Sequence, residues 1–368
     1  MRIGIIGTRG IPNHYGGFEQ FAEKVAVIWV EKGHEVTVYN SHNHPYKESH
    51  FKGVEIIHCV DPEQKLGTVG QFVYDLNCIL DARKRKYDIF LQLGYTSSSI
   101  WSFLMPKTSL IVTNMDGLEW RRSKYRPIVQ KFLKRAEKWA IEGSDVLVAD
   151  SIGIQDYLTK SYNAQSTYIA YGAEVCEDES SNSLMDYVVS KFDYNLVIAR
   201  LEPENSIEII LDGYVLSGDR RPILIVGNHL TKYGEFLKRK YQSSNGIRFL
   251  GGIYNSQVIN QLRIYCHLYF HGHTVGGTNP SLLEAMACGS VVCAHRNVFN
   301  RSILQGNGIY FENPEEVSEI MSFGISEERR SEIQNGNRQQ VALNFGWEKI
   351  AIEYLRLFED AMLKSLHG

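Results

Sequence analysis

Short β-branched runs alternate with longer amphipathic stretches along almost the whole chain, and this alternation limits the possible folds more than any other feature. The runs of the first series are residues 2–6, 35–39, 54–58, 88–93, 110–113, 145–149 and 167–170. The runs of the second series are residues 195–199, 223–226, 247–250, 267–271, 291–294 and 308–311. Such alternation is typical of parallel sheets connected by crossover helices, so the sequence predicts an α/β fold.

An acidic, serine-rich segment, Glu-Val-Cys-Glu-Asp-Glu-Ser-Ser-Asn-Ser, separates the two series and offers little to bury. A chain of 368 residues also exceeds the size at which a single hydrophobic core usually stops growing. We therefore expect two Rossmann-like, doubly wound domains at residues 1–175 and 191–349, joined by a linker at residues 176–190. The end of the chain is amphipathic with helical spacing, and residues 350–368 predict a helix that crosses back to the first domain.

The loops that follow the strands are the predicted places for functional residues. Open α/β sheets bind their ligands outside the carboxyl ends of the strands. Two such domains that face each other would form a cleft lined by these loops.

The loop after residues 267–271 is the strongest candidate for binding a nucleotide diphosphate. It carries Gly276 and Gly277, followed by Asn279 as a predicted helix N-cap and Pro280 at the first helical position. Glycines let a phosphate approach the backbone closely, and a helix N-terminus attracts anions through its unpaired N–H groups. For the turn alone, an ordinary reversal of the chain is an equally good interpretation.

Glu284 stands one helical turn beyond Pro280 and on the same face of the predicted helix. Its carboxylate could accept hydrogen bonds from ribose hydroxyls, and the N–H groups from Thr278 to Leu282 are expected to point outward. Burying an unpaired carboxylate costs on the order of several kcal/mol. We therefore expect Glu284 to be either exposed or paired.

Arg200 follows the run at residues 195–199 and could present its planar guanidinium to phosphate oxygens. The alternative is a surface ion pair with Glu202 or Glu204. Lys232, after the next run, is a further but weaker candidate for a phosphate contact.

The spacing of Gly4, Gly7 and Gly10 matches a dinucleotide-binding fingerprint only loosely. Nicotinamide enzymes usually place an acid after the second strand to bind ribose, whereas this chain has Asn40 and Ser41 there. The sequence therefore argues against NAD.

Two further loops of the first half carry candidates. Gly16 and Gly17 precede a predicted helix and suit a loop that closes over a phosphate or an acceptor, or else they form a plain connection. Asn114 and Asp116 come directly after a strand, and Asp116 could bind a sugar hydroxyl or orient an acceptor. The alternative is that Asp116 only forms a turn with Gly117.

The overall charge is balanced, with 39 basic and 42 acidic residues, which gives no support to nucleic-acid binding. Residues 121–138 are locally basic and predict an amphipathic helix that starts near Pro127. This face is either simply solvated or contacts an anionic membrane surface. No uninterrupted apolar run is long enough to span a bilayer. We expect a cytoplasmic protein, with peripheral attachment to the inner face of the plasma membrane as an open alternative.

Neither a metal ion nor a cofactor is expected. No Asp-x-Asp pair and no His/Cys cluster with ligand spacing occurs at a strand end. The six cysteines are scattered, without a Cys-x-x-Cys pair, and read as reduced core residues.

Several of these segments together resemble the retaining GT-B glycosyltransferases of family 4. They are Gly16-Gly17 and residues 148–151 (Val-Ala-Asp-Ser), 169–173 (Ile-Ala-Tyr-Gly-Ala), 199–204 (Ala-Arg-Leu-Glu-Pro-Glu) and 279–289 (Asn-Pro-Ser-Leu-Leu-Glu-Ala-Met-Ala-Cys-Gly). Residues 7–12, 15–19 and 115–120 look most similar to the bacterial rhamnosyltransferase branch, which builds polysaccharide repeats on a lipid carrier. The motifs cover nearly the whole chain in the family's order.

The resemblance implies a nucleotide-sugar donor held mainly by the second half, an acceptor held by the first, and transfer with retained configuration. The arginine that Arg200 matches contacts the donor diphosphate in the family, and the glutamate that Glu284 matches contacts the ribose. The glycine loop, here Gly16 and Gly17, comes near the phosphates.

Three positions depart from the family pattern. Gly276 stands where the family has a glutamate that engages the sugar, and His271 or His273 are candidates to compensate. Asn205 stands where a lysine is common, which leaves Lys232 or Arg9 to supply positive charge. A histidine that many relatives carry is replaced by Asn114 or Asp116.

The expected function is transfer of a hexosyl or deoxyhexosyl unit, above all L-rhamnose from dTDP-rhamnose, to a growing lipid-linked glycan. Arg200, Asp116 and Asn114 are the predicted catalytic residues. Two alternatives stay open: a nucleotide-sugar epimerase that does not use NAD, and a catalytically silent protein that binds nucleotide sugars.

Overall fold

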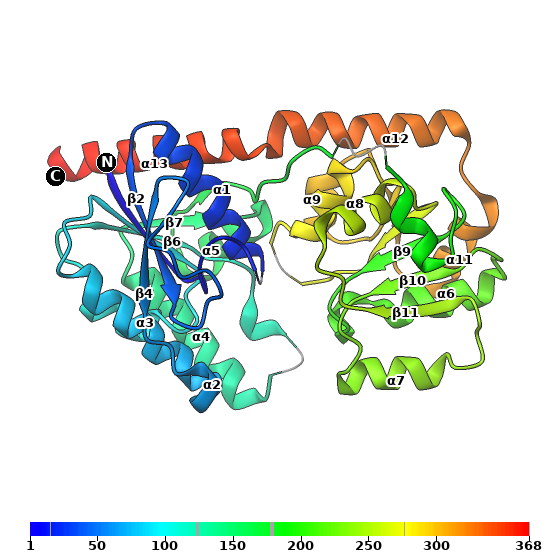
Figure 1. Ribbon diagram of the computed structural model, residues 1–368, viewed down its shortest axis with the longest axis horizontal. Coiled ribbons are helices and arrows are strands. Elements are labelled where there is room, and N and C mark those ends of the chain that lie inside the picture. The colour runs from blue at the N-terminus through cyan, green and yellow to red at the C-terminus, as the bar shows by residue number, and fades with distance from the viewer. Residues whose placement is uncertain (15, 123–124, 177–179, 276, 368) are drawn as a thin grey trace. The chain divides into compact units, whose positions relative to one another are not determined.

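The computed structural model describes residues 1–14, 16–122, 125–176, 180–275 and 277–367. It divides into two compact domains (Figure 1). The first domain contains Met1–Arg121, Tyr125–Gly172 and the C-terminal segment from Trp347, and the second contains Ala173–Gly346. The chain therefore leaves the first domain after Gly172 and returns to it at Trp347.

The described part of the first domain holds an eight-stranded sheet in the order β3-β4-β2-β1-β5-β6-β7-β8. Its strands are β1 (Arg2–Ile6), β2 (Glu35–Ser41), β3 (His50–Phe51), β4 (Val54–Cys59), β5 (Ile89–Leu93), β6 (Leu110–Asn114), β7 (Val146–Ala149) and β8 (Thr167–Tyr168). β1 pairs in parallel with both β2 and β5, so the strand order reverses at β1. Such a reversal point is where open α/β sheets bind ligands.

The helices of the first domain cover both faces of its sheet. They are α1 (Gly17–Glu31), α2 (Glu63–Leu66), α3 (Val69–Ala82), α4 (Pro127–Glu142), α5 (Ile152–Tyr162) and α13 (Trp347–His367), with 3₁₀ turns at Ser99–Leu104 and Glu119–Arg121. α1 and α13 lie on one side of the sheet, and α3 and α4 on the other (Figure 1).

Aromatic side chains join the predicted C-terminal helix to α1. The Trp29 indole N–H donates to the Ala351 carbonyl at 2.9 Å. The Phe21 and Tyr354 rings lie 5.2 Å apart, and those of Trp29 and Phe358 lie 5.5 Å apart, both edge to face. The end of the chain thus forms part of the first domain's core.

The described part of the second domain holds a six-stranded sheet, all of it parallel, in the order β11-β10-β9-β12-β13-β14. Its strands are β9 (Asn195–Ile198), β10 (Ile223–Val226), β11 (Ile247–Gly251), β12 (Leu268–His271), β13 (Val292–His295) and β14 (Ile309–Phe311). The order reverses between β9 and β12, which are direct neighbours. The second reversal point therefore lies at their carboxyl ends.

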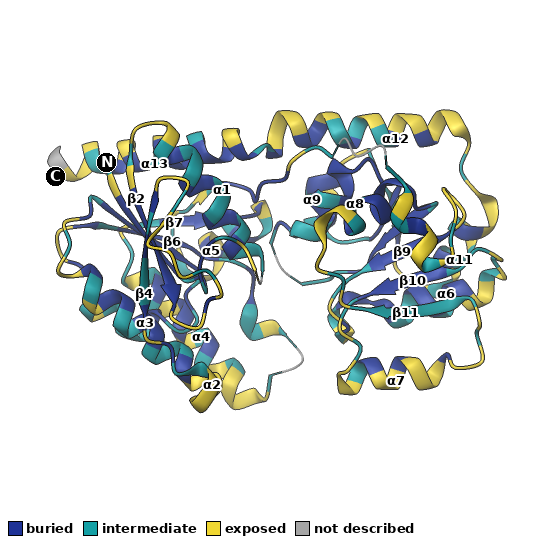
Figure 2. Ribbon diagram, viewed as in Figure 1, coloured by how far each residue is buried: buried dark blue, intermediate teal, exposed yellow. Residues whose placement is uncertain are grey.

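The helices of the second domain pack around this sheet. They are α6 (Ile207–Ser217), α7 (Lys232–Lys240), α8 (Ser256–Ile264), α9 (Pro280–Ala287), α10 (Val298–Leu304), α11 (Pro314–Phe323) and α12 (Glu327–Gln340). Shorter turns occur at Asn182–Tyr187, Pro203–Asn205 and Val341–Phe345. The strands of both sheets are mostly buried, while α7 and α12 expose their outward faces (Figure 2).

The region predicted as a linker, residues 176–190, contains packed structure where it is described. Residues 182–187 form a 3₁₀ turn in which Leu184 is buried, and the Ser183 N–H donates to the Gln261 side chain at 3.1 Å. Residues 177–179 lie outside the described part of the chain. The domain division itself falls just before residue 173, ahead of the predicted boundary at residue 175.

Across the described residues, none of the helices combines the length and the apolar character needed to cross a bilayer.

Candidate functional site

Three neighbouring strands of the second domain bring predicted residues to one edge. β9 lies between β10 and β12. Arg200 follows β9 and is exposed, Lys232 opens α7 after β10 and is also exposed, and His271 ends β12 and is buried. Because parallel strands end at the same edge, these side chains share one end of the sheet.

The start of α9 has the predicted cap but not the predicted free amides. Asn279 caps the helix, with its side chain accepting from the Ser281 N–H at 3.0 Å, and Pro280 is the first helical residue. The Leu282 N–H donates to the Asn279 carbonyl at 3.0 Å, and proline has no N–H. The expectation of outward-pointing amides was therefore wrong at Ser281 and Leu282, because Asn279 accepts from both of these N–H groups.

Gly277 and Thr278 lie in the turn before this cap, and Thr278 is buried. Gly276, the position where the family pattern has a glutamate, lies outside the described residues.

Glu284 is paired. Its Oε2 accepts from Arg263 Nη2 at 2.5 Å, and the side chains of Arg263 and Glu284 are 4% and 29% exposed. Burial lowers the pKa of Arg263, but the Glu284 charge outweighs it and the net shift is upward. The carboxylate is therefore held by a buried cation and still reaches solvent on one side.

Arg263 was missed by sequence reasoning. It lies in α8, between the buried residues Leu262 and Ile264. An arginine in an apolar stretch signals a buried ion pair, but its partner is 21 residues away and only the fold brings the two together.

Ser281 ties the first turn of α9 to the end of β9. Its hydroxyl donates to the Ile198 carbonyl at 3.2 Å and lies 2.6 Å from the Tyr269 hydroxyl. The helix that carries Glu284 and the loop that carries Arg200 therefore lie at the same edge of the sheet.

His271 and His273 form a stacked pair, with ring centroids 4.3 Å apart and planes 14° apart. Neither ring nitrogen of His271 has a hydrogen-bond partner among the described residues, nor has Nδ1 of His273. Burial holds the pKa of His271 well below its usual range. Burial and the charge of Arg200 lower the pKa of His273 to about 3. Both rings are therefore neutral at physiological pH.

The turn that holds the pair is fixed by its neighbours. A Cβ on Gly272 would lie 2.1 Å from the Asn205 carbonyl oxygen, so only glycine fits there. The Thr274 N–H and hydroxyl both donate to the Glu204 carbonyl, at 3.0 and 2.8 Å. Asn205 in turn donates to the Arg200 carbonyl at 2.6 Å and is buried. At this position, where the family pattern commonly has a lysine, the Asn205 side chain fixes the backbone of the Arg200 loop.

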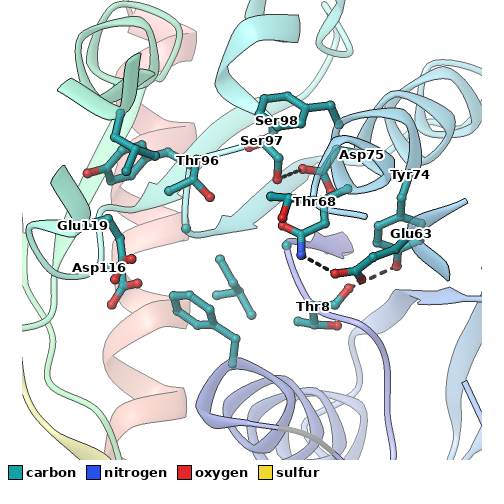
Figure 3. Close-up of a pocket in the computed structure, with 18 of the residues that line it drawn as sticks. Thr8, Glu63, Thr68, Tyr74, Asp75, Thr96, Ser97, Ser98, Asp116 and Glu119 are labelled. Carbon is teal, nitrogen blue, oxygen red and sulfur yellow. Dashed lines mark hydrogen bonds between the residues drawn. The ribbon is translucent and has the colours of Figure 1, made fainter. Parts of the chain in front are cut away.

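The first domain contains a cavity of about 500 Å³ at the carboxyl ends of β1, β5 and β6 (Figure 3). It is lined by Gly7, Thr8, Arg9, Phe18, Asp61, Glu63, Thr68, Gln71, Phe72, Tyr74, Asp75, Leu93, Gly94, Tyr95, Thr96, Ser97, Ser98, Asp116, Glu119, Tyr125, Ile128, Val129, Phe132 and Leu133. Hydroxyls and carboxylates line one part of the wall, and the apolar side chains of α4 line another.

Of the two polar residues predicted after β6, only Asp116 lines this cavity. Asp116 has a left-handed backbone (φ 50°), which the Asn114 side chain supports by accepting from the Asp116 N–H at 3.0 Å. Asn114 is buried and donates to the Tyr354 hydroxyl at 2.9 Å. Asn114 therefore positions the loop and anchors α13.

Gly16 is the N-cap of α1 in an extended conformation, and Gly17, predicted to precede the helix, is its first residue. The Gly16 carbonyl accepts from the Gln20 N–H at 3.1 Å, and the Gly17 carbonyl accepts from the Tyr171 hydroxyl at 2.9 Å. These backbone contacts hold the helix start inside the first domain.

Asp75 was not singled out from the sequence, although it is an acid within the apolar helix α3. It lines the cavity, is only 4% exposed, and accepts from the Ser97 hydroxyl at 2.6 Å. Burial raises the pKa of Asp75 to about 7, and the hydrogen bond from Ser97 opposes this rise.

The basic side chains of residues 121–138 are less accessible to a membrane surface than the sequence indicates. Lys134 is enclosed by Trp120, Tyr157 and Tyr162, with its ammonium 4.4 to 4.8 Å from the three ring centroids, and it pairs with buried Glu137 at 3.0 Å. Other basic residues of the run, including Arg126 and Lys131, are exposed. Part of the run is thus structural.

Comparisons with known proteins agree with this architecture. Residues 189–340 match the family described as glycosyl transferases group 1, and residues 1–174 match a domain of unknown function, DUF1972. An uncharacterized glycosyltransferase of Methanocaldococcus jannaschii is 27% identical over 247 residues. That alignment covers 61% of this chain and 61% of that protein, which is less than two thirds of its length.

Solved structures match over nearly the whole chain. Sucrose-phosphate synthase from Thermosynechococcus elongatus superimposes with a TM-score of 0.79 at 15% identity and covers 99% of both chains. HepE of Anabaena, solved in complex with UDP-glucose, gives a TM-score of 0.74 at 16% identity over 98% of this chain and 99% of that one. The chain therefore has the two-domain GT-B fold, and the part of it that matches the group 1 glycosyl transferase family is residues 189–340, within the second domain.

Proposed function

We propose that this protein is a glycosyltransferase that takes its donor, a nucleotide sugar, on the second domain. The observation that carries the proposal is the edge of that domain's sheet, where Arg200, His271, His273 and the Arg263-held Glu284 gather within the segment that matches group 1 glycosyltransferases. The relative solved with UDP-glucose lends support to this class of donor.

Each group at this edge suits a different part of the donor. The exposed guanidinium of Arg200 suits the diphosphate, with Lys232 as a second cation. Glu284, oriented by Arg263, suits the ribose hydroxyls. The neutral rings of His271 and His273 can each donate one hydrogen bond and accept another, which suits sugar hydroxyls. The turn of Gly277, Thr278 and Asn279 borders these groups.

The proposed transfer retains the anomeric configuration and proceeds on one face of the sugar. The bond from the anomeric carbon to the diphosphate oxygen breaks first, and Arg200 stabilises the charge on the departing diphosphate. A diphosphate oxygen then takes the proton of the incoming acceptor hydroxyl, while the acceptor's own oxygen bonds to the anomeric carbon. No protein nucleophile and no metal ion take part in this step.

The acceptor is assigned to the first domain, whose cavity offers hydroxyls and carboxylates, Asp116 among them, beside an apolar wall. In this proposal Asp116 orients the acceptor hydroxyl and Asn114 supports Asp116.

We assign L-rhamnose from dTDP-rhamnose as the preferred donor, on the basis of the motifs in the first half of the chain. The acceptor would be a lipid-linked glycan in cell-surface polysaccharide synthesis. Exposed Ile128 and Val129 on α4, next to exposed Arg126 and Lys131, would rest on an anionic membrane surface at the cytoplasmic side.

The direct test is incubation of the full chain with dTDP-rhamnose, UDP-glucose and GDP-mannose in turn, each with a lipid-linked acceptor. We expect release of the nucleoside diphosphate and a new glycosidic bond with one donor, dTDP-rhamnose first. The absence of both transfer and donor hydrolysis with every donor would count against the proposal. An isomerised donor without an acceptor would instead indicate an epimerase, and tight binding of an unchanged donor would indicate a silent binding protein.

A further inference from the structure

The cavity of the first domain has an uneven charge. Its described lining contains the carboxylates of Asp61, Glu63, Asp75, Asp116 and Glu119. Within this described lining, Arg9 is the one lysine or arginine. The lining therefore carries more acidic groups than basic ones.

Arg9 is neutralised by its neighbour. Its guanidinium donates to both carboxylate oxygens of Glu63, at 2.7 and 2.9 Å from Nη2 and 3.1 Å from Nε. Gln71 donates to the same carboxylate at 2.7 Å. Burial raises the pKa of Glu63, but the hydrogen bonds from Arg9 and Gln71 lower it below its ordinary value, so the pair stays ionised. Such a two-pronged pair satisfies much of the guanidinium's capacity to bind another anion.

The remaining acids face the cavity from two sides. Figure 3 shows Asp116 and Glu119 together at one side and Asp75 with Glu63 at the other, with the hydroxyl of Thr96 between the two groups. An anion placed in this space would meet carboxylates on both sides.

The rest of the wall suits an uncharged sugar with an apolar substituent. Hydroxyls of Thr8, Thr68 and Ser98 offer hydrogen bonds, and aromatic rings offer flat apolar surfaces for the C–H face of a sugar. The rings of Phe72 and Phe132 contact each other at 5.7 Å and join α3 to α4 at this wall. Polar and apolar surfaces are thus both available to one ligand.

We propose that this cavity admits uncharged glycosides and excludes sugar phosphates. Glu63 pairs with Arg9, which is the one lysine or arginine of the described lining, and the further carboxylates repel a phosphate. The inference rests on the proposed function, since it names the acceptor class of that reaction. It implies that a phosphate of a lipid-linked acceptor lies outside the cavity and that only the uncharged glycan end enters.

The test measures binding to the full chain without any donor, so its outcome does not depend on whether sugar transfer occurs. The probes are phenyl glycosides of glucose, galactose, mannose and rhamnose, together with glucose 6-phosphate and mannose 6-phosphate. Saturation-transfer NMR reports which probes bind. We expect binding of at least one phenyl glycoside and at least tenfold weaker binding of both sugar phosphates. Binding of no phenyl glycoside, or equal binding of a sugar phosphate, overturns the proposal.

The substitution Glu63→Gln gives a sharper test, because it frees the guanidinium of Arg9 within the cavity. We expect the variant to bind glucose 6-phosphate or mannose 6-phosphate at least tenfold more tightly than the parent chain. Glu55→Gln is the matched control, since Glu55 pairs with Arg85 at 3.3 Å and neither residue lines the cavity. An equal gain in the control, or none in Glu63→Gln, contradicts the inference.

A second variant keeps the test decisive if Glu63→Gln does not fold. At pH 8, above the pKa of about 7 that burial gives Asp75, Asp75→Asn removes one cavity carboxylate and leaves Arg9 paired. We expect a smaller gain in sugar-phosphate binding than with Glu63→Gln, with phenyl glycoside binding retained. If circular dichroism shows that both variants are folded, and neither binds sugar phosphates more tightly than the parent chain does, the charge-based exclusion is disproved.

Discussion

Arg200 is the exposed cation at the edge where β9, β10 and β12 end, and its backbone is fixed by Asn205. In the proposed reaction, replacing Arg200 with alanine should remove a charge that stabilises the departing diphosphate. We expect kcat/KM for the donor to fall by an amount that corresponds to about 2 to 4 kcal/mol of lost transition-state stabilisation. Steady-state kinetics with saturating acceptor measure this effect. Lys238→Ala, an exposed cation in the last turn of α7, serves as the control, and equal losses in both variants would argue against a specific role.

Arg263 and Glu284 should differ in what their removal costs. Glu284→Ala leaves a guanidinium buried without its carboxylate, which we expect to cost about 3 to 5 kcal/mol of folding free energy. Arg263→Met leaves a carboxylate that solvent reaches, so the cost should be only about 1 to 2 kcal/mol. Urea unfolding of both variants gives the two values. The reverse order would mean that the arginine is not the more buried partner.

Asp75 should make stability depend on pH. Its pKa is about 7 in the folded chain against an ordinary value of 3.8, so the folded state binds the proton more tightly. The stability it contributes is therefore complete below pH 3.8 and is lost as the pH rises to about 7. We expect Asp75→Asn, which does not titrate, to gain about 3 kcal/mol relative to the parent chain between pH 5 and pH 8. Urea unfolding at both pH values tests this, and parallel losses in the two proteins would contradict the raised pKa.

At the scale of the helix, α13 stabilises the first domain through Tyr354. Tyr354 packs against Phe21 on α1 and accepts from Asn114 at the end of β6. Tyr354→Phe should lose only the hydrogen bond, about 1 kcal/mol, whereas Tyr354→Ala should lose about 3 to 5 kcal/mol through the cavity it leaves. Denaturant unfolding measures both. Similar losses would mean that packing on α1 matters little.

The elements that could be predicted from sequence are those set by local chemistry. β1 and β10 have their predicted bounds, and the Asn279–Pro280 start of α9 is as expected, because caps and β-branched runs act within a few residues. The two-residue strand β3 was missed, since His50–Phe51 is too short for an alternating pattern and exists only by pairing with β4. Arg263 and Asp75 needed the fold, because their partners lie 21 and 22 residues away.

The candidate site residues follow the same rule. Arg200 could be nominated because it follows a strand, and Glu284 because it lies one turn into a helix that begins after a strand. His271 was nominated only because Gly276 departs from the family pattern. The stacking of His271 on His273 and the capture of Arg9 by Glu63 could not, because both depend on how separate side chains approach one another in space.

On the scale of the whole molecule, each domain has its own hydrophobic core. Buried clusters form around Tyr39 and Phe90 in the first domain and around Phe270 and Phe311 in the second. Since the chain returns to the first domain through α13, a change in that helix should act on the first core. We therefore expect calorimetry to resolve two unfolding transitions, with Tyr354→Ala lowering only that of the first domain.

A nucleoside diphosphate should act on the other transition. A ligand that binds only the folded state at a hundred times its Kd stabilises that state by about 2.7 kcal/mol. If the donor binds at the edge formed by β9, β10 and β12, dTDP or UDP should raise the unfolding midpoint of the second domain. The first-domain transition, which is the one that Tyr354→Ala lowers, should keep its midpoint. Scanning calorimetry of the parent chain and of this variant, with and without nucleotide, makes the assignment. A nucleotide shift confined to the first-domain transition would remove the donor from the second domain, because linkage stabilises only the unit that holds the ligand.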